Sequence, residues 1–173
     1  MTAGPLDATV AGLSTAPAQA RAAAAVPWTV VTLQPHDFAA WKTLAVAYKT
    51  FYETTLPDAA YQHAWQRLQA EDRIHAWAAK VDGQLVGVAH YLFHSSTWAQ
   101  DVCYLQDLFV AESARGQGVA RALIEQVART AQARGASRYY WLTHHTNARA
   151  RRLYDRVAAH HGFVRYDYPL ATA

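Results

Sequence analysis

The chain has 173 residues, of which 52% are hydrophobic and 17% are charged, and its formal net charge is +3 at pH 7. This length suits about one globular domain, and the composition excludes both a disordered chain and a membrane span, which needs about 18 consecutive apolar residues. Cys103 is the only cysteine, which excludes an intrachain disulfide and suits a reducing cytoplasm. Because Cys103 lies in an apolar run, we expect a buried, unreactive thiol.

The positive charge is concentrated in one part of the sequence. Residues 1–110 hold six Lys or Arg against nine Asp or Glu, whereas residues 111–152 hold eight Arg against two Glu. A basic segment within one domain indicates an anionic partner, either a phosphate-bearing cofactor or a nucleic acid. The alternative is that the arginines only solvate two helices.

The first 27 residues are rich in Ala, Pro, Ser and Thr and lack the basic and apolar regions of a secretory signal. We therefore expect residues 1–27 to be a disordered extension, and residues 28–173 to form the domain.

The first half of the domain begins with a β-branched run at 28–33, typical of a strand. Pro35-His36-Asp37 then opens a helix, and a second helix starts at Pro57-Asp58. Asp82-Gly83 lies between two strand-like runs and predicts a hairpin.

The second half continues with an apolar strand over 101–110 and an amphipathic helix over 118–134, which Gly135 ends. A strand is expected over 138–144. Asn147 can cap a helix that runs to His161 and ends at Gly162, and "FVRYDYPL" then predicts a last strand over 163–170.

This order predicts an α/β (α+β) fold, with a mixed central sheet of six to seven strands and flanking helices. In such sheets, ligands bind where strand order or direction breaks. The passage from strand 101–110 into helix 118–134 is the most informative such place.

That passage reads "YLQDLFVAESARGQGVARALIE", from Tyr104 to Glu125. Gly116 and Gly118 allow a ligand to approach the backbone, and the helix that follows offers unpaired N–H groups with partial positive charge. Arg115 and Arg121 add full charges, so the segment predicts a pyrophosphate site. The spacing matches neither a dinucleotide-binding fingerprint nor a Walker loop.

The segment Arg115 to Ala120 resembles the acetyl-CoA-binding pattern Arg/Gln-x-x-Gly-x-Gly/Ala of the GNAT superfamily of N-acetyltransferases. The later stretch "YYWLTHHTNARARRLYDRVAAHHGF" and the order of elements are also similar to that family, over residues 28–170. The resemblance is closest to the branch that acts on small primary amines, polyamines, D-amino acids or, in some cases, histones. It implies a GNAT-like acyl-CoA N-acyltransferase fold with acetyl-CoA as co-substrate.

The resemblance also implies roles for individual residues. The pantetheine arm would bond to the backbone of Leu108, Phe109 and Val110, and Asn147 would contact the cofactor. Tyr154 matches the family's tyrosine, and because a phenol stays protonated at neutral pH it can act as general acid toward the leaving sulfur. The pyrophosphate would be held by Arg115, Gly116, Gln117, Gly118, Val119 and Ala120.

Several groups could accept the proton of the amine. Polyamine-acetylating relatives have Glu-Asp where this chain has Gln106-Asp107, and Gln106 cannot take a proton. Asp107 either holds the ammonium, works through a water molecule, or is a structural acceptor. His144 and His145 are further candidates because imidazole titrates near neutral pH.

Glu53, His90 and His94 are three further polar side chains that could bind a ligand. Glu53, at the end of the first helix, either lines the acceptor pocket or is a surface acid. His90 and His94 lie on one strand with no Asp or Glu at a suitable spacing, so no metal site is expected.

We therefore expect an acetyl-CoA-dependent N-acetyltransferase that acts on a primary amine of a small cationic substrate, by direct attack through a tetrahedral intermediate. The alternatives are a protein or peptide (histone-like) N-acetyltransferase, a non-catalytic acyl-CoA sensor, and a nucleic-acid-binding protein. The expected partners are acetyl-CoA and the amine, without nucleic acid or membrane, in a cytoplasmic protein that could form a homodimer.

Overall fold

The computed structural model describes residues 28–70 and 73–170 of the chain. The extension expected over residues 1–27 lies outside these residues. Within them, no helix is both long and apolar enough to cross a membrane. The elements, in chain order, are β1 (Trp28–Val31), a 3-10 turn (Pro35–Asp37), α1 (Phe38–Phe51), α2 (Asp58–Gln69), β2 (Ile74–Val81), β3 (Gln84–His94), β4 (Val102–Val110), a 3-10 turn (Glu112–Ala114), α3 (Val119–Ala133), β5 (Arg138–Trp141) and α4 (Ala148–Val157).

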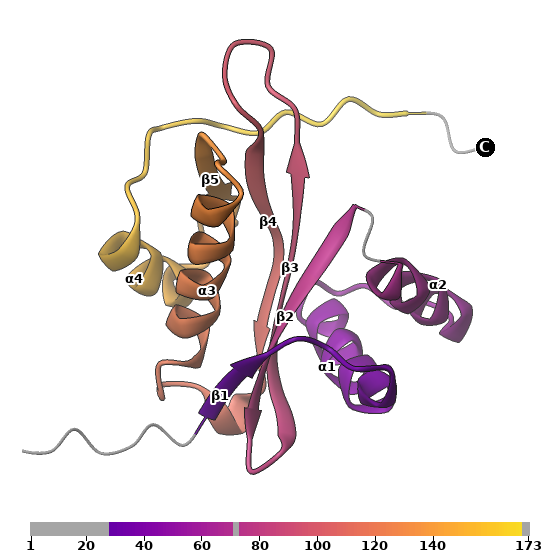
Figure 1. Cartoon of the computed structure of the whole chain (residues 1–173). Helices are drawn as coiled ribbons and strands as arrows, with labels where there is room; N and C mark the ends of the chain where they lie inside the picture. The colour runs from indigo at the N-terminus through magenta and orange to yellow at the C-terminus, as the bar shows by residue number, and fades with distance from the viewer. Residues whose placement is uncertain (1–27, 71–72, 171–173) are drawn as a thin grey trace, which may run out of the picture.

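The strands form one mixed sheet in the order β1-β2-β3-β4-β5. The neighbouring strands from β1 to β4 are antiparallel to one another, and β5 is parallel to β4. Figure 1 shows α1 and α2 on one face of this sheet and α3 and α4 on the other. Each face carries its own core, because strand side chains alternate between the two faces.

The core under α3 includes Leu105, Leu123 and Val127, which are almost completely buried. On the opposite face, Trp41 and Leu44 of α1 pack against Val88 of β3. The buried stripe of α3 follows helical spacing, as its sequence predicts.

A β-bulge interrupts the middle of β4. Tyr91 of β3 lies opposite Leu105 and His90 lies opposite Asp107, so Gln106 is an extra residue without a partner on β3. This extra residue resets the alternation of side chains. Leu105 and Leu108 consequently both face the α3 core, although they are three positions apart.

Two glycines are required by the fold. A Cβ on Gly87 of β3 would lie only 3.2 Å from side-chain atoms of both Val119 and Leu123, so the glycine lets α3 approach the sheet. Gly135 has φ +73°, which allows the chain to turn back after α3, as the sequence predicts.

The sheet has five strands among the described residues, so the expectation of six to seven strands is wrong. The missing element is the strand expected over 163–170, where the chain is extended but assigned to no strand. Its composition suits a strand, but a strand also needs a neighbouring backbone. The side chains of this segment are instead exposed.

The last helix also differs from the expectation. Asn147 caps α4 as predicted, since its Oδ1 accepts a hydrogen bond from the Ala150 amide at 3.2 Å. The helix ends at Val157 and does not reach His161 or Gly162. Because residues 158–161 offer no large apolar side chain, a further turn would bury nothing.

Candidate active site

The backbones of β4 and β5 separate midway along β4. Their pairing ends at Leu105 and Trp141, and the rest of β4, from Gln106 to Val110, has no neighbour on the β5 side among the described strands. Backbone groups there that point away from β3, other than the Val110 carbonyl oxygen, which accepts from Arg115, are available to bond a ligand. The separation begins next to the bulge at Gln106, which lies at the apex of the opening.

The other end of β4 leads to the start of α3. Gly116 and Gly118 have φ values of +78° and +86°, and no atom lies within 4 Å of a Cβ placed on Gly116. Gly118 is the N-cap of α3 and no side chain caps the helix. The first N–H groups of α3 are therefore available to an anion.

The two arginines of this segment lie in different surroundings. The Arg115 Nε atom donates to the Val110 carbonyl oxygen at 3.1 Å, which fixes the guanidinium beside the end of β4. Arg121 is largely exposed and pairs with Glu125 at 2.7 Å. Arg115 is thus the better placed cation for a ligand at the glycines.

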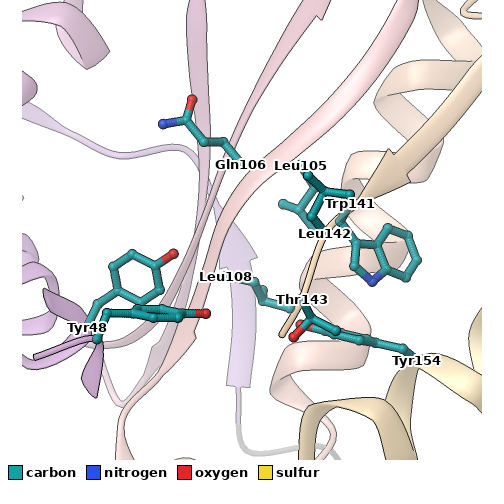
Figure 2. A pocket seen from close by; sticks show the side chains of 9 residues that line it. Tyr48, Leu105, Gln106, Leu108, Trp141, Leu142, Thr143 and Tyr154 are labelled. Carbon is teal, nitrogen blue, oxygen red and sulfur yellow. The ribbon is translucent and has the colours of Figure 1, made fainter. Parts of the chain in front are cut away.

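A narrow pocket of about 30 Å³ lies where β4 and β5 separate. Figure 2 shows Tyr48 of α1 on one side of it and Tyr154 of α4 on the opposite side. The pocket is mostly aromatic and apolar, with few polar groups, a composition typical of ligand sites. Its lining residues are Tyr48, Tyr52, Leu105, Gln106, Leu108, Trp141, Leu142, Thr143 and Tyr154.

A second pocket, of about 540 Å³, adjoins the first. The two share Tyr52, and the larger one opens between the end of α1 and the start of α4. Its lining includes more polar and charged residues than that of the first pocket. Its lining residues are Phe51, Tyr52, His144, Thr146, Asn147, Ala148, Arg149 and Arg152.

Asp107 lies between two residues that line the narrow pocket, and its side chain turns toward α1. Its Oδ2 atom lies 3.1 Å from the Nδ1 atom of His90, and the Tyr48 hydroxyl also hydrogen-bonds the carboxylate. Burial acts to raise the pKa of Asp107, but these bonds and nearby Lys49 outweigh it and lower the pKa below its ordinary value. Asp107 is therefore a carboxylate anion at neutral pH.

Tyr154 reaches the narrow pocket from α4 and packs against Trp141, with ring centroids 5.4 Å apart. Burial, with a smaller contribution from Tyr52, raises the pKa of Tyr154 to about 12. The hydroxyl is therefore protonated at neutral pH and is able to donate a proton.

The remaining candidate residues from the sequence differ in whether they line one of the two pockets. Gln106 lines the narrow pocket, and His144 and Asn147 line the larger one. Glu53 lines neither pocket and is exposed, with φ +53° just after α1. His145 is also exposed and lines neither pocket, and its ring lies beside that of His144.

Several residues of the site are not recognisable in the sequence. Trp41 and Tyr48 appear there only as apolar positions of a helix, and His90 appears only as an isolated histidine. The pairing of His90 with Asp107 depends on the bulge, which the sequence does not reveal. The spacing of Tyr48 and Tyr52, one helical turn apart, was the available signal for an aromatic wall.

The prediction for Cys103 can be compared with the structure. Cys103 is fully buried, as expected, and burial raises the pKa of its thiol to about 11. In the part of the chain that the structure describes, no group of three or more His, Cys, Asp or Glu side chains is arranged to hold a metal ion.

Comparisons with known proteins agree with this geometry. A family model described as the Acetyltransferase (GNAT) family matches residues 38–159. A D-amino-acid N-acetyltransferase of Saccharomyces cerevisiae is 37% identical over 134 residues, which cover 75% of this chain and 83% of the relative. A thialysine N-epsilon-acetyltransferase of Bos taurus is 36% identical over 75 residues, which cover 43% of this chain and 44% of the relative.

Solved structures show the same fold. An aminoglycoside N-acetyltransferase in complex with CoA is similar with a TM-score of 0.67 and 20% sequence identity, over 84% of this chain and 93% of that one. At this identity the likeness establishes the architecture alone.

Proposed function

Because this chain belongs to the GNAT family of acetyltransferases, we propose that it transfers the acetyl group of acetyl-CoA to the primary amine of a small cationic substrate. The observation that carries the proposal is the position of Asp107. Asp107 lies in the part of β4 that begins where β4 and β5 separate. Its anionic carboxylate hydrogen-bonds Tyr48, which lines the narrow pocket, and the next residue, Leu108, also lines it.

The chain's own geometry suits acetyl-CoA. The free backbone of β4 at Leu108, Phe109 and Val110 would bond the pantetheine amides, and Asn147 lies across the opening at the start of α4. The left-handed glycines and uncapped start of α3 suit a pyrophosphate, which the segment from Arg115 to Ala120 would hold. When bound, acetyl-CoA supplies an acetyl group activated as a thioester.

The reaction needs a neutral amine and a protonated leaving sulfur. In our proposal, Asp107 attracts the ammonium and the amine loses its proton to water near Gln106. The amine nitrogen then adds to the acetyl carbonyl carbon to form a tetrahedral intermediate, which collapses as the carbon–sulfur bond breaks. Tyr154 donates a proton to the leaving sulfur, and the second proton that the nitrogen loses returns to Tyr154 through water. A backbone N–H of β4 near Phe109 would stabilise the negative charge that develops on the carbonyl oxygen.

The relatives suggest which amines to test first. The names of two relatives specify D-amino acids and thialysine, which are both small amines. The larger pocket carries Arg149 and Arg152, which could pair with the carboxylate of an amino acid whose ammonium lies near Asp107. A small acceptor is therefore favoured over a protein, and Glu53 and His144 would at most shape the rim.

The test is release of free CoA thiol from acetyl-CoA with D-phenylalanine, thialysine, spermidine and a lysine-containing histone-tail peptide, each supplied separately. We expect turnover with at least one of the three small amines and little with the peptide. Acetyl-CoA alone should raise the melting temperature. Stabilisation without turnover would favour the acyl-CoA sensor, and no stabilisation at millimolar acetyl-CoA would contradict the proposal.

We also propose that the protein is a cytoplasmic homodimer. The single cysteine, which cannot form an intrachain disulfide, supports a reducing compartment. The dimer is supported by the apolar side chains of the segment 163–170, of which Phe163 is 85% and Tyr166 is 90% exposed. A second copy of the chain would cover these side chains, and among the described strands β5 is a sheet edge to which a strand can add.

A further inference from the structure

We infer that Trp41 and His90 form a hydrogen-bond relay that positions Asp107 to receive the ammonium group of the acceptor amine. The inference rests on the proposed function, because it concerns how the acceptor is bound. Neither Trp41 nor His90 would touch the reacting atoms, so both are positioning residues.

The relay crosses from α1 to the sheet. The indole Nε1 of Trp41 donates to the Nε2 atom of His90 at 3.0 Å, and the Nδ1 atom of His90 lies 3.1 Å from the Asp107 Oδ2 atom. His90 and Asp107 are opposite one another on β3 and β4, at the bulge. Three side chains from three elements are thus aligned toward one carboxylate oxygen.

The donor in Trp41 determines the tautomer of His90. An indole N–H is only a donor, so the Nε2 atom of His90 must be an acceptor and carry no proton. The neutral imidazole therefore has its proton on Nδ1, which donates to Asp107. The indole hydrogen bond occupies the lone pair of Nε2, so both ring nitrogens of His90 have a partner in the relay.

This tautomer preserves the charge of Asp107. A neutral imidazole donates a hydrogen bond but brings no full positive charge, so the carboxylate remains an anion that can attract an ammonium group. An imidazolium in the same position would form an ion pair with Asp107 and compete with the substrate. Trp41 thus acts on substrate binding through the protonation state of His90.

The exposed fraction of the side chains increases along the relay, from Trp41 to Asp107. Trp41 is 2% exposed, the His90 side chain 12% and the Asp107 side chain 20%, so access to water increases toward the carboxylate. The other groups near Asp107 are Tyr48 and Lys49 of α1 and Tyr104 of β4. Tyr48 is the hydroxyl that an incoming ammonium would meet first, since it lines the narrow pocket.

The first experiment replaces the donor to Asp107. His90→Leu removes the hydrogen bond, whereas His90→Asn keeps an N–H near the position of Nδ1. With the amine that gives the highest kcat/KM in the thiol assay, we expect KM for the amine to rise about tenfold in His90→Leu and much less in His90→Asn, since an unsatisfied buried partner costs about 1–3 kcal/mol. KM for acetyl-CoA should stay within about twofold.

The matched control is His94→Leu. His94 lies on the same strand, but its ring contacts Tyr140 and the Ser95 carbonyl oxygen and not Asp107. Circular dichroism melts of all variants separate loss of folding from loss of amine binding. If His90→Leu folds and leaves KM for the amine unchanged, or if His94→Leu raises it equally, the inference is wrong.

The second experiment frees the Nε2 atom. In Trp41→Phe the imidazole is able to take a second proton, so the acidic limb of kcat/KM for the amine should move to higher pH than in the wild type. His90→Asn combined with Trp41→Phe should abolish this displacement, because asparagine does not titrate. A purely structural role for Trp41 would lower kcat/KM equally at every pH.

A third measurement does not depend on catalysis. In the protein alone, ¹⁵N chemical shifts of the His90 ring nitrogens should report a protonated Nδ1 and an unprotonated Nε2, and Trp41→Phe should alter this pattern at mildly acidic pH. A protonated Nε2 in the wild type would overturn the relay. If the expected tautomer is found but no amine is acetylated, the proposed function fails while the relay geometry stands.

Discussion

Tyr154 is half-buried, and it lines the narrow pocket. Because its pKa is raised to about 12, the acid form persists throughout the pH range in which the protein is expected to work. A basic limb of activity below pH 10 would therefore not arise from loss of this proton. It would have to come from another group or from the substrate.

We predict that Tyr154→Phe lowers kcat by about 100-fold or more, since general acid catalysis contributes about 10²–10⁴ to the rate. Phenylalanine keeps the contact with Trp41, so acetyl-CoA should stabilise the variant against heat as it does the wild type. Stopped assays of thiol release and thermal melts measure the two effects. An unchanged kcat would remove Tyr154 as the acid.

Some site residues can be recognised in the sequence and others cannot. Positive φ at Gly116 and Gly118 and helix capping by Asn147 are local properties, and the structure shows both features. The surroundings of Asp107 depend on contacts with Trp41 and His90, which are distant in sequence. The alternation of side chains along a strand also fails to predict which face of the sheet the Asp107 side chain lies on, because the bulge adds one residue.

The contact between β3 and α3 depends on the absence of a side chain at Gly87. A methyl group there would lie 3.2 Å from Val119 and Leu123 side-chain atoms and 3.3 Å from the Phe109 carbonyl oxygen. We predict that Gly87→Ala lowers the free energy of unfolding by about 1–3 kcal/mol. Urea denaturation measures this, and a change below 0.5 kcal/mol, about that of a neutral surface substitution, would contradict it.

The turn before α1 is joined to the sheet by a buried ion pair. The Lys80 Nζ atom of β2 lies 2.7 Å from the Asp37 Oδ1 atom, and the Asp37 side chain is 7% exposed. Burial acts to raise the pKa of Asp37, but the bonds from Lys80 and the Gln34 amide lower it below its ordinary value. The stabilisation is therefore present above the unfolded pKa of Asp37 and is lost as pH falls through its folded pKa.

We predict that Asp37→Asn lowers the free energy of unfolding by about 1–3 kcal/mol at pH 7, because it leaves Lys80 without its anion. The difference from the wild type should shrink below about pH 4, where the native carboxylate also becomes protonated. Urea melts at pH 7 and pH 3 test this. A difference that is equal at both pH values would show that charge is not the cause.

Whole elements were predictable where their pattern is strong. The hairpin at Asp82-Gly83 and the amphipathic helix α3 lie where hydrophobic periodicity and turn residues place them. The segment 163–170 has equally good strand composition but forms no strand in the single chain. Composition shows that a segment is able to form a strand. Whether it does so also depends on whether another backbone segment lies close enough to pair with it.

On the scale of the whole molecule, several large apolar side chains of the segment 163–170 are exposed. Figure 1 shows this segment running away from α4 past the start of β4. We predict that the wild type has about twice the chain mass of 19.2 kDa in light scattering, and that a chain ending at Gly162 is a monomer. Trp98→Ser is the control, since Trp98 is 94% exposed and lies outside this segment. A monomeric wild type would exclude the dimer.

The separation of β4 from β5 also has a consequence for hydrogen exchange. Amides of β4 that point away from β3 beyond Leu105 have no strand to bond, so they should exchange rapidly with solvent deuterium. Acetyl-CoA should slow exchange over Gln106–Val110 while the paired part of β4 changes little. The exchange rates of individual amides in this unpaired part of β4 therefore report where along the strand acetyl-CoA binds.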